Sequence, residues 1–284
     1  MAVLEAAPGA VEGAADAPAA RPVLKWAGGK QQLLPQLLSR VPETYGRYIE
    51  PFFGGGALFF ALAPKNAVVA DSNAEIISLY RQLAKDAGAV IAAMDGHAYD
   101  EAHFYAVRAQ AIESLSPVEA AARTLYLNRS CFNGLYRVNR QGAFNVPFGR
   151  YVNPRLCDAP GLEAAGRALS AATILCADYR DVLAEHARPG DFVYLDPPYL
   201  PAGGYADFKR YTKDQFREAD HRALADEVRR LAALGCHVLL SNAKHPLVWE
   251  LYGDYAIEVV PARRNISSRA ATRRGEEVIV TITP

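Results

Sequence analysis

The sequence of 284 residues has few of the side chains that bind metals. Its four cysteines stand far apart, without the short spacing of a metal site, and its six histidines are equally scattered. The cysteines are Cys131, Cys157, Cys176 and Cys236. We therefore expect no metal site, and we expect the thiols to be reduced and mostly buried, as in a cytosolic protein.

Long apolar runs are also missing, so we expect no membrane-spanning segment. Residues 1–20 are nearly all Ala, Gly, Pro and a few acids, without the basic start and leucine-rich core of a signal peptide. We interpret them as a disordered tail and expect the protein to be cytoplasmic. Hydrophobic residues make up 51% and charged residues 22% of the chain, which is typical of a soluble globular protein.

Two stretches lack acidic residues. The net charge of zero argues against a nucleic-acid partner, yet arginine is the only charged residue type between Ala120 and Cys157 and between Pro261 and Gly275. The arginines are Arg123, Arg129, Arg137, Arg140, Arg150 and Arg155 in the first stretch, and Arg263, Arg264, Arg269, Arg273 and Arg274 in the second. This distribution predicts phosphate contacts. Two solvated faces remain the alternative.

The first half of an α/β sheet is visible near the start. Strand patterns at 48–52 and 67–70 flank a glycine-rich turn at 53–56 and an apolar helix at 57–62, and Asp71 closes the second strand. This order is typical of the nucleotide-binding half of a doubly wound sheet. Glycines let the backbone approach a cofactor closely, and an acid at the end of the second strand can bind ribose hydroxyls. The alternative for Asp71 is a charge at a helix N-terminus.

The later pattern predicts an interrupted sheet. Apolar residues at helical spacing occur at 73–85, 102–115 and 117–128, followed by a hairpin at 138–148 around Gln141 and Gly142. Strand patterns then return at 173–177, 192–195, 237–241, 255–260 and 278–282, with a long amphipathic helix at 214–234. We predict a mostly parallel α/β sheet with an antiparallel edge, formed by residues 21–72 and 154–284, and a mainly helical inserted domain at 73–153.

The most informative motif is Asp196-Pro197-Pro198-Tyr199, directly after the strand predicted at 192–195. Open α/β sheets bind ligands at the carboxyl ends of their strands. The prolines make the turn rigid and leave carbonyl oxygens without competing N–H donors. A carboxylate, carbonyl acceptors and a flat ring suit an exocyclic amine on a planar base. A structural loop at a strand end is the alternative.

Residues 25–30 resemble a phosphate-binding loop but lack its defining residues. Leu24 stands where the first glycine should be, and Gln31 replaces the hydroxyl that would hold magnesium, so we exclude an NTPase. Trp26 can instead cover a cofactor ring, and Lys30 can pair with a carboxylate. A core tryptophan beside surface lysines is the alternative.

Residues 128–137 combine arginine, asparagine and aromatic side chains. Arg129 and Arg137 can read guanine edges, and Asn128 and Asn133 can read bases through paired hydrogen bonds. Phe132 can fill the gap left by a flipped base. A helix end with a buried phenylalanine and solvated arginines is equally compatible with the segment.

In their order along the chain, these motifs closely resemble the Dam family of DNA adenine methyltransferases, the alpha-type or D12 class. The resemblance runs from about Pro22 to the C-terminus and includes 144–149 and 263–268. It implies a Rossmann-like S-adenosylmethionine-dependent methyltransferase fold with an inserted target-recognition domain. It also implies a bacterial or phage enzyme that methylates N6 of a flipped-out adenine in duplex DNA and releases S-adenosylhomocysteine.

The resemblance also implies residue roles. Residues expected to contact the cofactor are Trp26, Lys30, Phe52, Gly54, Asp71, Asp178, Tyr179 and Asp196. Asp196 and the Pro197 carbonyl would accept hydrogen bonds from the adenine amine, with Pro198 shaping the turn and Tyr199 stacking on the base. Residues expected to contact DNA are Lys25, Arg129, Phe132, Asn133, Arg137, Pro147, Arg263, Arg264, Ser267 and Ser268. Family members often have tyrosine where Phe132 stands, so a hydroxyl is lost here.

Several alternatives remain. Cytosine N4 enzymes more often carry serine in place of Asp196, and related protein methyltransferases usually carry asparagine there. Two further alternatives are an enzyme that methylates RNA and a regulator that binds DNA without catalysis. We expect GATC as the recognition sequence. Other family members recognise longer sequences, so a longer recognition sequence is the alternative. Many relatives act as monomers, so we expect a monomer, with a dimer or a partner nuclease not excluded.

Overall fold

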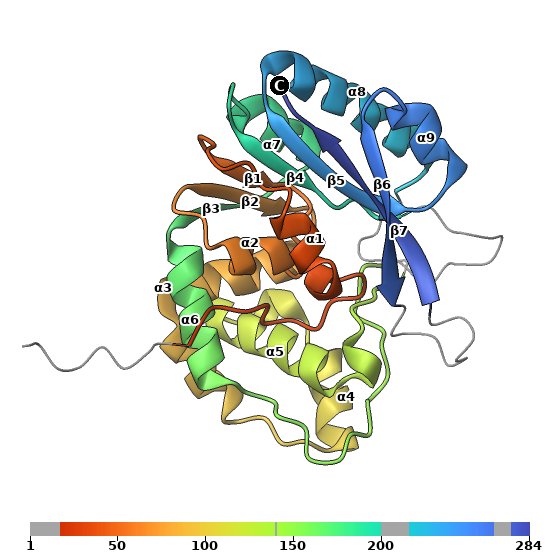
Figure 1. The fold of residues 1–284 in the computed structure, drawn as a ribbon. Coiled ribbons are helices and arrows are strands. Elements are labelled where there is room, and N and C mark those ends of the chain that lie inside the picture. The colour runs from red at the N-terminus through yellow and green to blue at the C-terminus, as the bar shows by residue number, and fades with distance from the viewer. Residues whose placement is uncertain (1–17, 140, 200–215, 264–273) are drawn as a thin grey trace, which may run out of the picture.

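The computed structural model describes residues 18–139, 141–199, 216–263 and 274–284. A central sheet lies between two layers of helices, and a further group of helices extends below it (Figure 1). No helix in the described ranges is both long and apolar enough to cross a membrane.

The sheet has seven strands within the described residues, in the order β3-β2-β1-β4-β5-β7-β6. They are β1 (Tyr48–Glu50), β2 (Ala67–Asp71), β3 (Ala172–Cys176), β4 (Phe192–Leu195), β5 (His237–Ala243), β6 (Ala256–Arg263) and β7 (Arg274–Ile282). The first five are parallel, while β7 is antiparallel to both of its neighbours. The predicted parallel sheet with an antiparallel edge is confirmed. Its order reverses between β1 and β4, where such sheets bind ligands.

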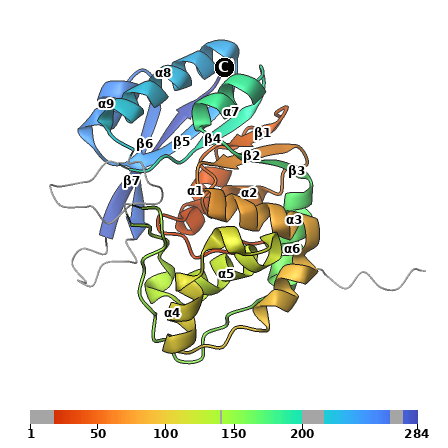
Figure 2. The same cartoon turned by 180° about the vertical axis from the view of Figure 1, so that it is seen from behind.

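Residues alternate between two hydrophobic cores along each strand. In β1, Tyr48 belongs to the core on one face and Ile49 to the core on the other. On the first face lie α1 (Leu34–Leu38), α2 (Ala57–Leu62) and α3 (Ala74–Met94), and on the second face lie α7 (Tyr179–His186), α8 (Glu218–Leu234) and α9 (Pro246–Tyr252). Figure 2 shows the two layers from behind. Burial on both faces is the reason that the inner parallel strands are mostly apolar.

The lower group contains α4 (Glu101–Ala109), α5 (Pro117–Ser130) and α6 (Ala159–Ser170). The helices α5 and α6 pack against α3, and α4 packs against α5. Ser116 and Glu119 form a capping box that starts α5. These helices share one continuous core with the lower face of the sheet. The predicted helices are confirmed, although α3 continues past a kink at Asp86 and the pattern at 102–115 divides into α4 and a turn at Ile112–Ser114.

The hairpin predicted around Gln141 and Gly142 is also confirmed. Val138 pairs with Phe144, and the Asn139 amide donates to the Ala143 carbonyl at 2.9 Å. The helices α6, α7 and α9 were not predicted. The last two have only eight and seven residues, and the only large apolar residues that α6 buries are Leu162 and Leu169, so their apolar periodicity is weak. Of the helix predicted at 214–234, residues 214 and 215 lie outside the described residues.

Asn128 fastens the N-terminal segment to α5. It is completely buried, and its Oδ1 accepts the Lys25 amide at 2.8 Å. Its Nδ2 donates to the carbonyl oxygens of Lys25, at 2.8 Å, and Gly134, at 3.2 Å. The neighbouring Arg129 donates to the Val23 carbonyl at 2.6 Å. The prediction that Asn128 reads bases is wrong because its amide is buried and satisfied by backbone groups.

We predict that Asn128→Ala lowers the free energy of unfolding by about 2–4 kcal/mol, because one backbone donor and two carbonyl acceptors lose a buried partner. Urea unfolding of the free protein measures this loss. Gln110→Ala is the matched control, since Gln110 is exposed and its truncation should change stability by less than about 0.5 kcal/mol. Equal free energies of unfolding for the Asn128 and Gln110 variants would contradict the role of Asn128 in holding the N-terminal segment on α5.

Candidate active site

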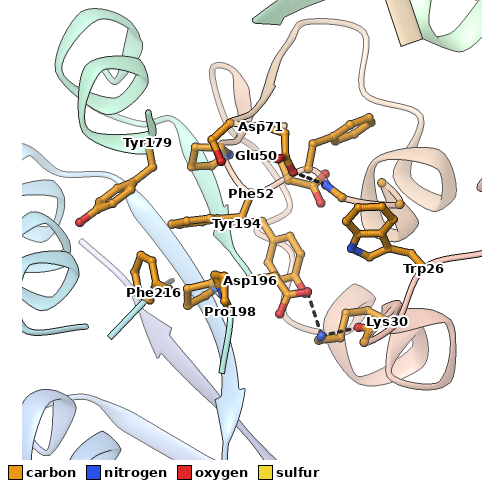
Figure 3. A pocket seen from close by; sticks show the side chains of 18 of the residues that line it. Trp26, Lys30, Glu50, Phe52, Asp71, Tyr179, Tyr194, Asp196, Pro198 and Phe216 are labelled. Carbon is orange, nitrogen blue, oxygen red and sulfur yellow. Dashed lines mark hydrogen bonds and ion pairs between the residues drawn. The ribbon is translucent and has the colours of Figure 1, made fainter. Parts of the chain in front are cut away.

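A cavity of about 620 Å³ opens at the carboxyl ends of β1, β2 and β4. Its walls come from the N-terminal segment at 26–30, the glycine turn after β1, the start of α7 and the turn at 196–199. Side chains from these four segments, far apart in the sequence, point toward one another in Figure 3. The cavity therefore lies where the strand order reverses, as expected for a ligand site in an open sheet.

Trp26 lies on the glycine turn. Gly54 and Gly56 have positive φ angles, of 46° and 65°, which side chains other than glycine rarely adopt. A Cβ on Gly54 would lie only 2.5 Å from the Trp26 Nε1, and one on Gly55 would lie 3.0 Å from the Trp26 Cβ. The glycines are thus required both by the turn and by the indole packed against it.

Asp71 holds the same turn from the end of β2. Its Oδ2 accepts the Gly54 amide and its Oδ1 the Asn73 amide, each at 2.9 Å. Burial raises the pKa of Asp71, and these backbone hydrogen bonds act in the opposite direction. Asn73 supplies the side chain that caps α3, and Asp71 accepts the Asn73 amide just before that helix, so the alternative of a charge at a helix N-terminus also fits its position.

Three aromatic rings form the opposite wall. The ring centroid of Phe52 lies 5.1 Å from that of Tyr179 and 5.9 Å from that of Phe216. Asp178 caps α7 just before Tyr179, and its carboxylate also accepts the Arg180 Nε at 2.8 Å. The structure thus places Phe52, Asp178 and Tyr179 at the cavity wall. Phe216 lacked a sequence signal because it stands alone before α8.

The Asp196 carboxylate is held through both of its oxygens. The Lys30 Nζ lies 2.8 Å from Oδ2, and the Ser241 hydroxyl donates to Oδ1 at 2.8 Å. Lys30 is only 5% exposed and also donates to the Gly28 carbonyl at 2.6 Å. The predicted pairing of Lys30 with a carboxylate is therefore confirmed, while the contribution of Ser241, at the end of β5, was not predicted.

Tyr199 is fixed beside this carboxylate. Its hydroxyl donates to the Glu277 Oε2 at 2.8 Å, and the Lys30 Nζ lies 4.8 Å from its ring centroid. Burial, followed by the charges of Asp196 and Glu277, raises the pKa of Tyr199 well above its usual value. The phenol therefore remains a neutral hydrogen-bond donor.

Glu50 lies within the strand pattern at 48–52, but no role was predicted for it. It ends β1, is 2% exposed, and accepts a hydrogen bond from the Tyr48 hydroxyl at 2.7 Å. Burial raises its pKa well above the usual value. The hydrogen bond from Tyr48 opposes that rise, and the charges of Asp196 and Asp71 add to it. The free protein thus holds a carboxyl group that favours its protonated form at the cavity wall.

Four residues predicted to contact DNA gather on another part of the surface. The Phe132 amide donates to the Pro147 carbonyl at 2.8 Å, and the Phe132 side chain is 49% exposed. Asn133 is also exposed, with a φ of 54°. A Cβ on Gly134 would lie 2.3 Å from the Lys25 side chain, so Lys25 packs against the same turn. The alternative of a buried Phe132 is wrong.

The arginines have varied surroundings. Arg123 is 3% exposed and lies 3.7 Å from the Glu75 carboxylate, so its predicted phosphate contact is wrong. The Arg137 Nε donates to the Asn145 Oδ1 at 2.8 Å across the hairpin. Arg150 and Arg155 are exposed but pair with acids outside the stretch, Glu101 at 3.4 Å and Asp158 at 2.8 Å. Outside the described residues lie Arg140, Arg264, Ser267, Ser268, Arg269 and Arg273, together with the side chains of Arg263 and Arg274.

Known proteins are similar to this chain in sequence. The sequence model of the family described as D12 class N6 adenine-specific DNA methyltransferase matches residues 26–266. The chain belongs to this family. It is 41% identical to the Type II methyltransferase M1.LlaDCHI of Lactococcus lactis subsp. cremoris, over 92% of this chain and 95% of that protein. It is 36% identical to the DNA adenine methylase of Serratia marcescens (87% and 92%) and 34% identical to that of Escherichia coli K12 (92% and 95%).

This D12 class methyltransferase takes its methyl group from S-adenosylmethionine and transfers it to adenine N6 in DNA. The cavity fits that cofactor. Its acidic lining residues Asp71, Asp178, Asp196 and Asp220 outnumber the basic Lys30 and Arg180, which suits a ligand that carries sulfonium and ammonium cations. Across the described ranges, no three His, Cys, Asp or Glu side chains gather as a metal site would require.

We predict that Glu50→Gln makes the free methyltransferase more stable at neutral pH. A carboxyl group whose pKa is higher in the folded than in the unfolded state contributes most stability below the unfolded value of about 4.3, and that contribution falls as the pH rises toward the folded pKa. Glutamine keeps an acceptor for Tyr48 without this loss. The melting temperatures should be similar near pH 4 and should diverge toward pH 8, by about 2–4 °C per kcal/mol.

The matched control is Glu276→Gln, which changes an exposed carboxylate and should follow the wild type at every pH. Thermal scans across pH 4–8 compare the three proteins without cofactor. A constant difference between Glu50→Gln and the wild type at every pH would contradict the assigned protonation.

Proposed function

We propose that this methyltransferase receives a flipped-out adenine beside Asp196 and Tyr199, within the duplex site GATC. The observation that carries the proposal is the Asp196 carboxylate, fixed between Lys30 and Ser241 at the wall of the cavity. A carboxylate held in place before the substrate arrives needs little reorganisation during the reaction.

Asp196 addresses the weak nucleophilicity of the adenine amine, whose lone pair is delocalised into the ring. Each carboxylate oxygen accepts about two hydrogen bonds, so Lys30 and Ser241 leave room for an N–H donor. Hydrogen bonds from N6 to Asp196 and to the Pro197 carbonyl would localise the lone pair on nitrogen. They would also stabilise the positive charge that develops there. S-adenosylmethionine supplies the methyl group as part of a sulfonium, an already activated leaving group.

Tyr199 gives the base its orientation. Its hydroxyl donates a hydrogen bond to the Glu277 carboxylate, and the Lys30 ammonium group lies over its ring. A base stacked on this ring would present its amine to Asp196 at a fixed angle, which favours in-line transfer. We assign Trp26, Phe52, Gly54, Asp71, Asp178 and Tyr179 to the cofactor side of the cavity.

We further propose that residues 73–153 form the target-recognition domain. The exposed Phe132 and Asn133 would fill or brace the gap left by the flipped base. Lys25, Arg137 and Pro147 lie near them and would contact bases, while Arg129, bound to the Val23 carbonyl, would act by holding that segment. Phosphate contacts are assigned to Arg263, Arg264, Ser267 and Ser268. We favour GATC from the resemblance of the target-recognition domain to family members that modify it.

We expect the enzyme to act as a monomer in the cytoplasm of a bacterium or on phage DNA. The proposal does not depend on a partner nuclease. Neither the oligomeric state nor such a nuclease changes the chemistry assigned to the cavity.

Incubation of the purified protein with S-adenosylmethionine and unmethylated duplex DNA tests the proposal. The DNA is digested to nucleosides for mass spectrometry, and a second portion is sequenced to locate modified bases. We expect N6-methyladenine, confined to GATC. Methylation at another sequence would overturn the site while leaving the cavity chemistry intact, whereas N4-methylcytosine would overturn the assigned base. Methylation of single-stranded DNA or RNA in preference to the duplex would overturn the flipping step.

A further inference from the structure

Glu277 reaches the active site from the antiparallel edge of the sheet. It lies on β7, opposite Ala243 of β5, and its side chain is 22% exposed. Neighbouring residues on a strand point to opposite faces, so Glu276 points the other way and pairs with Lys244 at 2.8 Å. Glu277 is not among the residues that line the cavity, so any effect on the reaction must pass through other side chains.

Two groups of the active site contact or approach Glu277. Its Oε2 accepts the Tyr199 hydroxyl at 2.8 Å and lies 4.0 Å from the Lys30 Nζ. A hydrogen bond from a neutral donor to a carboxylate is stronger than one between two neutral groups, so it restricts the phenol more firmly. Lys30 is also the partner of Asp196, so Glu277 contacts Tyr199 directly and is connected to Asp196 only through Lys30.

We infer that Glu277 is a positioning residue for methyl transfer: it anchors the Tyr199 hydroxyl so that the ring is already set as the stacking wall for the flipped adenine. The flat face of a ring can guide a base only when rotation about its side-chain bonds is restricted. The Lys30 ammonium lies near the ring centroid and Glu277 holds the hydroxyl, so the ring is restrained at two points. This inference rests on the stacking role proposed for Tyr199.

Glu277 should therefore affect binding of the flipped base and leave binding of the cofactor unchanged. Loss of the Glu277 carboxylate should leave the walls formed by Phe52, Asp71 and Tyr179 unchanged, since the hydrogen bonds and the ring contact described for them join other segments. It should reduce the rate of transfer and the occupancy of the flipped-out state. A merely structural glutamate would instead affect stability and both substrates together.

The experiment uses the full chain with Glu277→Leu, Glu277→Gln and Glu276→Leu. Single-turnover methylation measures the rate, and duplex DNA with 2-aminopurine at the target position reports flipping by fluorescence. Calorimetry measures S-adenosylmethionine affinity. We expect Glu277→Leu to slow transfer about tenfold and weaken the fluorescence signal, with cofactor affinity changed by less than about twofold. Glu277→Gln keeps an acceptor for Tyr199 and should recover most of the rate.

A double-mutant cycle tests the route through Tyr199. Tyr199→Phe removes only the hydroxyl, so it should slow transfer about as much as Glu277→Leu, and the double variant should be no slower than either. Additive losses in the double variant would overturn the inference. So would a Glu277→Leu enzyme with the wild-type rate, or a Glu276→Leu control that is equally slow.

Tyr199→Ala distinguishes this inference from the proposed stacking role. If Tyr199→Ala methylates at the wild-type rate, the stacking role itself fails, and the inference about Glu277 fails with it. If Tyr199→Ala is slow while Glu277→Leu is not, Tyr199 still stacks on the base and only the anchoring by Glu277 is wrong.

Discussion

The ion pair between Lys30 and Asp196 joins the N-terminal segment to the end of β4, and the active site depends on it. Lys30 is almost fully buried, so both charges lie in an environment that screens them weakly. Such a pair does little for stability compared with apolar packing, but removal of one partner leaves an uncompensated charge. Its value here is geometric: with Ser241 on the other oxygen, the carboxylate has one orientation before any substrate enters.

The proposed target-recognition domain at 73–153 is in direct contact with the part of the cavity that we assign to the cofactor. Tyr136 packs on Trp26 with ring centroids 5.5 Å apart, and its hydroxyl donates to the Asn73 Oδ1 at 3.4 Å. Asn73 in turn donates its amide to Asp71. Together with the Asn128 clamp on Lys25, these contacts connect the segment expected to read DNA with the glycine turn. A displacement of the segment expected to read DNA would therefore also displace the glycine turn, and the reverse.

Local motifs made much of the site predictable from the sequence. Asp71 and Asp196 each follow a recognisable strand, and the carboxyl ends of parallel strands share one edge, so their proximity follows from the pattern. Ser241 and Glu277 were not predicted, because their place beside Asp196 and Tyr199 depends on which strands are neighbours, and no short motif encodes that order. Arg123 was misassigned for a similar reason, since its partner Glu75 comes from another helix.

The measurement that tests the central claim most directly is single-turnover methyl transfer by Asp196→Ala, with duplex and cofactor binding measured on the same protein. If a fixed carboxylate activates the adenine amine, transfer should be abolished, while duplex affinity should remain within a few fold of the wild-type value. Transfer at a rate near that of the wild type would contradict the role assigned to Asp196 and the importance of its pairing with Lys30.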